Sequence, residues 1–215
     1  MRDAFIQEFL RKIFDVAVSL ANLVGLLPIL ILVAVWIKCI SRGPLFYTQV
    51  RVGKDGKPFT VYKFRTMHHN AEETTGPMWA KKKDSRLIKG GKFLKDTHLD
   101  EVPQFFNVLK GDMHVVGPRP ERPAFVDQFS ETIPDYWQRT RVKPGIAGLS
   151  QITYDYDKSL DDVKRKLSKD IEYIENRTVL LDIKILFNTF LVVVTGRLQP
   201  IKLDAQDRKG KTPAK

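Results

Sequence analysis

Residues 13–37, IFDVAVSLANLVGLLPILILVAVWI, are the stretch that decides the fold of this chain. Only Asp15, Ser19 and Asn22 interrupt its apolar residues. As a straight helix the stretch would be about 37 Å long, compared with about 30 Å for the hydrocarbon core of a bilayer. Such a segment is rare in a globular domain, and it predicts an N-terminal membrane anchor.

Pro28 predicts a bend near the middle of this helix. Proline removes a helical N–H and opposes the preceding turn, and Gly25 lies three residues upstream. Cations flank both ends of the segment, so the positive-inside rule gives no direction of crossing; they are Arg11, Lys12, Lys38 and Arg42. A re-entrant helix that bends at Pro28 and a kinked spanning helix are therefore equally compatible with the sequence.

Composition restricts the class of protein and its partners. The 215 residues, 43% of them hydrophobic, suffice for one core plus an anchor but hardly for two large domains. The net charge of +11 indicates an anionic partner. We expect no nucleic acid, because neither a groove-entering motif nor aromatics interleaved with the cations are evident. The single cysteine, Cys39, excludes an internal disulfide.

A β-hairpin is predicted after the anchor. Residues 45–52 and 58–67 are rich in β-branched and aromatic side chains, and Asp55-Gly56 between them is a turn signal. The period of two places Lys63 and Arg65 on one face of the second strand. Solvated edge charges explain this pair as well as an anion site does.

The segment between residues 81 and 95 is strongly basic. It is either solvated surface or a patch that holds the protein against anionic lipid. Its cations, opposed only by Asp84, are Lys81, Lys82, Lys83, Arg86, Lys89, Lys92 and Lys95.

The adjacent carboxylates Asp100 and Glu101 are the main candidates for chemistry. Thr97 with Asp100 resembles a capping box, so helix capping is one explanation of the pair. Phosphate chemistry with a bound divalent cation is the other. Because adjacent helical residues point about 100° apart, one carboxylate could attack while the other binds a cation.

Two loops are suited to phosphate, although simple turn chemistry also explains them. Arg119 stands between Pro118 and Pro120, which limit the backbone freedom around it. Arg141 and Lys143 precede a glycine-containing turn where backbone can approach a ligand closely.

Five segments together resemble the bacterial sugar transferase family, the monotopic phosphoglycosyl transferases. They are VYKFRTM (61–67), LDEVPQ (99–104), NVLKGDM (107–113), GPRP (117–120) and KPGIAGLSQ (143–151). The resemblance implies transfer of a sugar 1-phosphate from a UDP-sugar to undecaprenyl phosphate, with release of UMP. It also implies a re-entrant helix broken at Pro28 and a catalytic domain on the cytoplasmic face of the bacterial inner membrane.

The same resemblance implies roles for individual residues. Asp100 would be the nucleophile that forms an aspartyl phospho-sugar. Mg²⁺ would bridge Glu101 and the diphosphate, with Asp100 as a second candidate ligand. The candidates for holding substrate phosphates are Lys63, Arg65, Lys95, Arg119, Arg141, Lys143 and Gln151. Positions 95 and 143 carry Lys where relatives often carry Arg, which makes any grip there a point-charge contact. Ser150 in place of a commoner alanine is expected to change little.

The expected fold is α/β, mainly helical with a small β-hairpin. We expect an anchor over residues 1–42, a catalytic domain over 43–200 and a disordered tail over 201–215. Residues 159–174 predict an amphipathic helix that begins at Ser159, and 178–195 predict an interfacial helix, with packing on the core as the alternative.

The chain resembles the short members of the family, and it would catalyse the first membrane step of glycoconjugate assembly. Its expected partners are a UDP-sugar, undecaprenyl phosphate and membrane phospholipid. Two competing hypotheses are a membrane-anchored basic adapter and an ordinary glycosyltransferase, which would release UDP.

Overall fold

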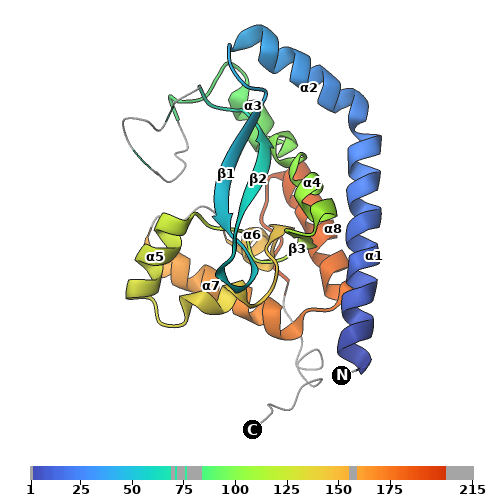
Figure 1. Cartoon of the computed structure of the whole chain (residues 1–215), viewed down its shortest axis with the longest axis vertical. Coiled ribbons are helices and arrows are strands. Elements are labelled where there is room, and N and C mark those ends of the chain that lie inside the picture. The colour runs from blue at the N-terminus through green and yellow to red at the C-terminus, as the bar shows by residue number, and fades with distance from the viewer. Residues whose placement is uncertain (1, 69–70, 72–75, 77–83, 155–158, 202–215) are drawn as a thin grey trace.

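The N-terminal helix is bent, as Pro28 predicts. In a computed structural model, which describes residues 2–68, 71, 76, 84–154 and 159–201, α1 (Arg2–Gly25) and α2 (Leu27–Ile40) meet at 60° (Figure 1). Pro28 lies in the first turn of α2, where a helical N–H has no partner to lose. Within the described part of the chain, no single helix is long and apolar enough to cross a membrane, but this bent pair meets both conditions jointly.

Helix α1 buries several polar side chains and exposes many large apolar ones. Arg11, Asp15 and Ser19, spaced by four residues, are buried against the rest of the protein. The Arg11 guanidinium donates to Asp182 at 2.8 Å, and Asp15 accepts from the Val115 N–H at 2.9 Å. Large apolar side chains of α1 are instead exposed; they are Phe5, Ile6, Phe9, Leu10, Ile13, Val16, Leu20 and Val24.

The predicted hairpin is confirmed. β1 (Phe46–Val52) and β2 (Pro58–Phe64) are antiparallel, and a short 3₁₀ turn (Lys54–Gly56) joins them. Asp55 and Gly56 both have positive φ, 55° and 75°, as a tight hairpin turn requires. The Asn107 side chain closes the outer edge of β2, because its Oδ1 accepts from the Tyr62 N–H and its Nδ2 donates to the Thr60 carbonyl.

The segment after the hairpin is built from short elements. α3 (Gly91–Asp96) leads into a 3₁₀ turn (Leu99–Glu101), and α4 (Gln104–Lys110) follows it. β3 (His114–Val116) then pairs in parallel with β4 (Gly145–Ala147), a strand pair that the sequence did not reveal. Gly117 and Gly145 cross so closely there that a Cβ on Gly145 would lie 2.0 Å from the Gly117 nitrogen.

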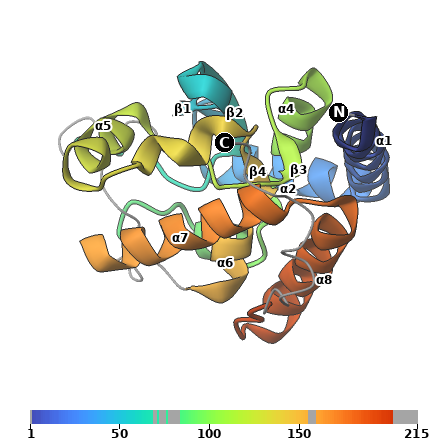
Figure 2. The same ribbon diagram turned by 90° about the horizontal axis from the view of Figure 1, so that it is seen from below.

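The remaining helices cover this centre (Figure 2). They are α5 (Pro123–Thr132), a 3₁₀ segment (Tyr136–Arg141), α6 (Leu149–Thr153), α7 (Leu160–Asn176) and α8 (Val179–Thr195). Ser159 caps α7, as expected, by accepting the Asp162 N–H. In α8, Leu181 and Ile185 are buried while Phe187 and Phe190 are exposed, so the helix packs on the core and still presents an apolar face.

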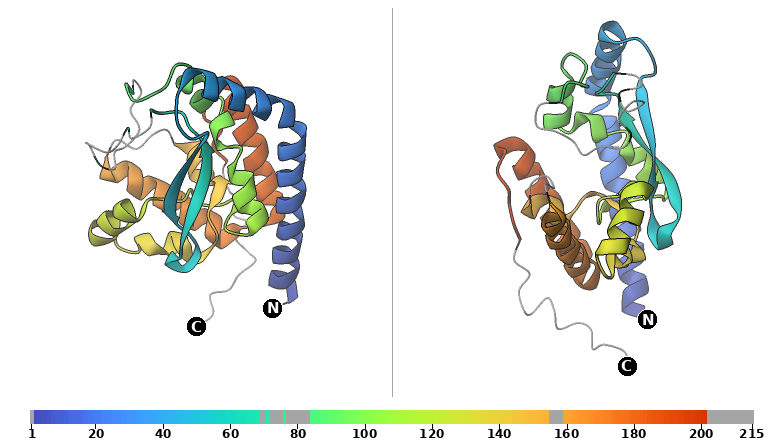
Figure 3. Two further views of the ribbon diagram at one scale, coloured as in Figure 1. Left: turned by 45° about the horizontal axis from the view of Figure 1, so that its top comes forward. Right: turned by 90° about the vertical axis from the view of Figure 1, so that its left-hand side faces the viewer.

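The bent helix pair packs against hydrophobic clusters of the rest of the chain. Val33 and Ile37 of α2 pack with Phe64, Ile88 and Leu94. Figure 3 shows that α4 and α8 both lie beside α1. The mainly helical α/β class with a small hairpin is therefore observed. Lys81, Lys82, Lys83 and nearly all of the expected tail lie outside the described residues.

Candidate active site

Asp100 and Glu101 lie on the 3₁₀ turn between α3 and α4, and each is only 7% exposed. The capping-box interpretation is wrong. The Thr97 hydroxyl donates backwards to the Phe93 carbonyl at 2.7 Å, so it belongs to the end of α3. The residue before the turn is His98, with a left-handed φ of 56° and no capping bond. Two buried carboxylates thus remain without a capping role.

Glu101 is the centre of an ion cluster. Its Oε1 accepts from Lys63 Nζ at 2.6 Å and from Arg119 Nη2 at 2.5 Å, while Oε2 accepts from Arg119 Nη1 at 3.2 Å. Burial opposes ionisation, but the charges of Arg119 and Lys63 outweigh it and hold the pKa of Glu101 well below its usual value. Glu101 is therefore an ionised, fully paired carboxylate.

Asp100 has the opposite electrostatic environment. Burial, reinforced by the neighbouring Glu101 charge, raises the pKa of Asp100 to about 7 against the opposing cations Lys63, Arg119 and Lys95. Among the described side chains and backbone groups, none forms a hydrogen bond with its carboxylate. Neighbouring acids with separated pKa values can take different chemical tasks.

The structure brings three of the expected phosphate-binding residues to this pair. Lys63 and Arg119 contact Glu101 directly. Lys95, in the last turn of α3, is near enough for its charge to lower the pKa of Asp100. The site therefore combines two carboxylates with three cations from β2, α3 and the loop after β3.

Other expected residues lie elsewhere. Arg65 donates to the carbonyls of Ser41 and Arg42, both at 2.8 Å, and so fixes the chain just after α2. Lys143 lies beside Gly111, at the far end of α4 from Glu101. Arg141 is exposed on its 3₁₀ segment.

Gln151 and its neighbour Ser150 are tied into the loop after β4. Gln151 Nε2 donates to the Ile146 carbonyl at 3.3 Å, and its buried Oε1 has no hydrogen-bond partner within the described ranges. The Ser150 hydroxyl donates at 2.8 Å to buried Asp170 on α7. The sequence interpretation undervalued this hydroxyl, because nothing in the sequence indicates that Asp170 faces it.

A cleft with about 260 Å³ of empty volume adjoins Arg119. Residues that sequence reasoning missed lie around it. Arg139 lines the cleft and pairs with Asp170 at 2.8 Å, while Arg51 donates to the Pro120 carbonyl at 2.9 Å. Neither arginine belongs to a motif or shows a distinctive spacing, so no local signal could have found them.

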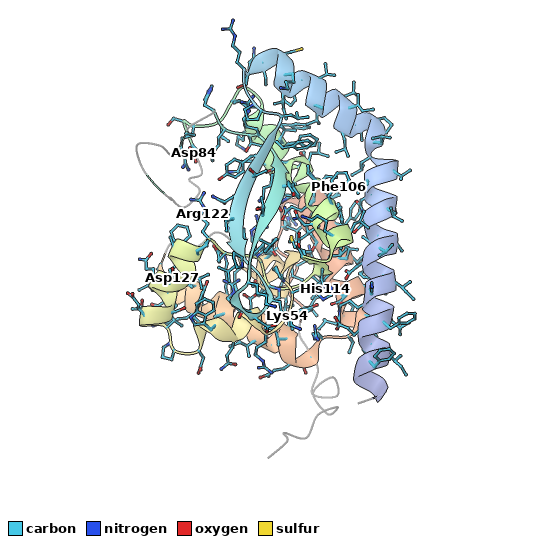
Figure 4. The ribbon with its side chains drawn as sticks, viewed as in Figure 1. Lys54, Asp84, Phe106, His114, Arg122 and Asp127 are labelled. Carbon is cyan, nitrogen blue, oxygen red and sulfur yellow. The ribbon has the colours of Figure 1, made fainter. Side chains whose placement is uncertain are left out.

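A second group of missed residues joins α1 to the strand that precedes Arg119. His114 of β3, on the side of the core that faces α1 (Figure 4), lies 2.5 Å from Asp15 Oδ2 through its Nδ1. On α7, the Tyr173 hydroxyl donates to Asp182 Oδ1 at 2.7 Å, and Asp182 in turn accepts from Arg11. Asp15, a polar residue of the apolar segment, thus binds β3, whereas Asn22 donates to the Val18 carbonyl within α1.

Comparison with known proteins agrees with the motifs. A family model described as bacterial sugar transferase matches residues 6–196. A UDP-N-acetylgalactosamine-undecaprenyl-phosphate N-acetylgalactosaminephosphotransferase of Aeromonas hydrophila is 41% identical over 191 residues, which cover 89% of this chain and 45% of that protein. A UDP-glucose:undecaprenyl-phosphate glucose-1-phosphate transferase of Klebsiella pneumoniae is 42% identical over 181 residues, 83% of this chain and 39% of that protein.

A third relative matches this chain over nearly the whole of the relative's own length. The exopolysaccharide production protein PSS of Rhizobium leguminosarum bv. phaseoli is 35% identical over 192 residues, 86% of this chain and 96% of that protein. This chain spans less than half the length of the Aeromonas and Klebsiella proteins.

Proposed function

This chain belongs to the bacterial sugar transferase family, and from this premise we propose that it transfers a sugar 1-phosphate from a UDP-sugar to undecaprenyl phosphate and releases UMP. The names of its relatives support the donor and acceptor classes. The observation that carries the proposal is the buried Asp100–Glu101 pair, in which Lys63 and Arg119 neutralise one carboxylate and leave the other available. We further propose that the reaction is the first membrane step of glycoconjugate assembly.

Asp100 acts as the nucleophile in a two-step transfer. A carboxylate oxygen of Asp100 attacks the sugar-bearing β-phosphorus, the bond from that phosphorus to the bridging oxygen breaks, and UMP leaves with that oxygen. An oxygen of the polyprenyl phosphate then attacks the same phosphorus, and the aspartyl ester bond breaks to return the carboxylate. Covalent catalysis of this kind divides one difficult transfer into two easier ones.

Lys63 and Arg119 supply the positive charge that lets anions approach each other. Both cations contact Glu101. A diphosphate presents more acceptor oxygens than one carboxylate, and a guanidinium binds phosphate through two parallel hydrogen bonds. We therefore expect Arg119 to shift at least one of its hydrogen bonds from Glu101 to the donor.

Asp100 and Glu101 are also a suitable pair for Mg²⁺. No group of three His, Cys, Asp or Glu side chains forms a metal site within the described residues. Mg²⁺, however, commonly uses only one or two carboxylates together with substrate phosphates and water. When bound, the ion would neutralise charge on the diphosphate.

We propose that the bent helix pair re-enters the cytoplasmic face of the bacterial inner membrane and that phospholipid covers its apolar side. The support is the exposure pattern of α1, in which Arg11 and Asp15 are buried and Phe5 and Phe9 are exposed. Ala4→Cys and Ser41→Cys, each introduced after Cys39→Ser, test the topology in membrane vesicles. If the helix pair re-enters, both cysteines should be labelled from the same side of the membrane. Labelling of the two cysteines from opposite sides rejects re-entry.

The released nucleotide tests the reaction. Detergent-purified protein is incubated with Mg²⁺, undecaprenyl phosphate and a panel of UDP-sugars, and the nucleotide is identified by chromatography. UMP supports the proposal, UDP indicates an ordinary glycosyltransferase, and no release with retained lipid binding indicates an adapter. Mass spectrometry of trapped reaction mixtures should locate a phospho-sugar on Asp100, and Asp100→Asn should abolish UMP release.

A further inference from the structure

The backbone of the Pro118-Arg119-Pro120 segment is held by three successive carbonyl contacts. The Pro118 carbonyl accepts from the Gly145 N–H at 2.9 Å. The Arg119 carbonyl accepts from Arg139 Nη2 at 2.8 Å, and the Pro120 carbonyl accepts from Arg51 Nη1 at 2.9 Å. Since proline has no N–H, carbonyls are the main groups by which this segment can be tied down.

The Arg139 guanidinium is itself fixed by partners outside the segment. Arg139 donates to the Tyr136 hydroxyl at 2.5 Å and pairs with Asp170 at 2.8 Å. Asp170, only 1% exposed, also accepts the Ser150 hydroxyl. Arg51 lies 3.6 Å from Glu121, the residue after the clamped segment. The Arg139 guanidinium therefore has little freedom to follow the segment if it moves, whereas Arg51 ties Pro120 and Glu121 to β1.

Packing does not confine the segment on every side. Pro118, Arg119 and Pro120 all line the 260 Å³ cleft, together with Arg139. On this side, hydrogen bonds to its carbonyls therefore contribute to fixing the position of the backbone. The side chain that depends on this position is Arg119, which reaches Glu101 on the turn before α4.

We propose that Arg139 and Arg51 are positioning residues. Arg139 clamps the Arg119 carbonyl and Arg51 clamps the following Pro120 carbonyl, so that the Arg119 guanidinium meets Glu101 and the donor diphosphate. The clamp itself follows from the contacts above. Its effect on catalysis rests on the proposed function. Neither arginine is hydrogen-bonded to the acidic pair; Arg139 acts through the backbone of Arg119 and Arg51 through that of Pro120.

Hydrogen exchange tests the clamp without any need for activity. Arg139→Lys keeps a positive charge beside Asp170 but loses the planar fork that reaches three acceptors at once. In the full chain in detergent, we expect faster deuterium uptake at the Gly145 and Val52 amides, which donate to the Pro118 and Glu121 carbonyls, and the same result for Arg51→Gln. Arg165→Lys, an exposed arginine of α7, is the matched control. Uptake at the Gly145 and Val52 amides that stays at the wild-type level in both variants would overturn the clamp.

A double-mutant cycle tests whether the clamp acts through Arg119. Because displacement of a catalytic group by about 1 Å can cost roughly 100-fold in rate, we expect Arg139→Lys to lower kcat/KM for UMP release at least tenfold. In an Arg119→Gln background the same substitution should change kcat/KM less than about twofold, since nothing is left to position. If Arg139→Lys lowers kcat/KM by the same factor with and without Arg119→Gln, positioning through Arg119 is overturned.

The two experiments separate failure of the clamp from failure of the proposed function. If wild-type protein releases no UMP with any UDP-sugar, the proposed function fails, while the exchange experiment still decides the clamp. If UMP release is normal in Arg139→Lys despite faster exchange, the clamp exists but does not position Arg119 for catalysis, and the proposal is overturned.

Discussion

Arg119 binds Glu101 through both terminal nitrogens of its guanidinium, at 2.5 and 3.2 Å. This bidentate contact keeps Glu101 ionised in a buried site. The charge retained on Glu101 in turn raises the pKa of its neighbour Asp100. One arginine thus influences both acids, directly in one case and through a carboxylate in the other.

UMP release should depend on pH near neutrality. The pKa of Asp100 is raised to about 7, and only its ionised form can attack phosphorus. We expect kcat/KM, which reports the free enzyme, to rise with pH up to a plateau above an inflection near 7. Initial rates between pH 5.5 and 8.5 at fixed Mg²⁺ measure this. A profile that is flat from 6 to 8 contradicts the assignment.

Asp100→Asn should abolish transfer and yet stabilise the fold at alkaline pH. Because the folded-state pKa of Asp100 lies above the usual aspartate value of 3.8, stability falls as pH rises from about 4 to about 7. Each pKa unit corresponds to about 1.4 kcal/mol, so ionised Asp100 costs the folded state up to roughly 4 kcal/mol. Thermal unfolding in detergent should show a higher Tm for the variant at pH 8, and the difference should vanish near pH 4.

Arg11→Ala should destabilise the chain strongly. Arg11 and Asp182 are 2% and 1% exposed, and removal of one partner of a buried pair costs about 3–5 kcal/mol. The double variant Arg11→Met with Asp182→Leu should recover much of that loss, since no buried charge is left unpaired. Lys12→Ala, an exposed change on the same helix, is the control in equilibrium unfolding. Equal losses in the single and double variants would argue against charge burial as the cause.

Gly145→Ala should disrupt the strand crossing at the base of Arg119. A Cβ there would meet the Gly117 backbone at 2.0 Å, a contact that only a backbone shift can relieve. Overpacking of this kind costs about 1–3 kcal/mol or more, and the shift should also lower UMP release. Gly25→Ala makes the same change where nothing lies within 4 Å, so stability and activity should be retained. Equal tolerance of both substitutions would contradict the crossing.

Ser150→Ala should destabilise the fold by about 1.5–3 kcal/mol, the usual range for a hydrogen bond to a charged group. Its hydroxyl donates to an Asp170 carboxylate that is almost fully buried. Ser168→Ala is a suitable control, because that exposed hydroxyl contacts only a backbone carbonyl on α7. A loss for Ser150→Ala no larger than that of the control, in chemical denaturation, would show that Asp170 does not need this donor.

Local patterns in the sequence predicted some elements well. The bend depends on Pro28, the hairpin on Asp55-Gly56 and the start of α7 on Ser159, and each signal acts within a few residues. The capping-box prediction was wrong because it also relied on a pattern of only a few residues. Thr97 bonded backwards to α3, and a local pattern does not say which of two helices a hydroxyl will serve.

The sequence by itself determined that the N-terminal segment is apolar and bent, that a hairpin follows it, and which motifs place the chain in its family. Only the tertiary structure decided that Arg119 and Lys63 meet at Glu101 while Arg65 and Lys143 lie elsewhere. It also decided that Arg139 holds the backbone of Arg119 and that Arg51 holds the backbone of Pro120. The physical reason is the distance along the chain between the residues that interact. Turns, caps and hydrophobic periodicity depend on neighbours along the chain, whereas a buried charge is stabilised only by partners that packing brings from distant segments.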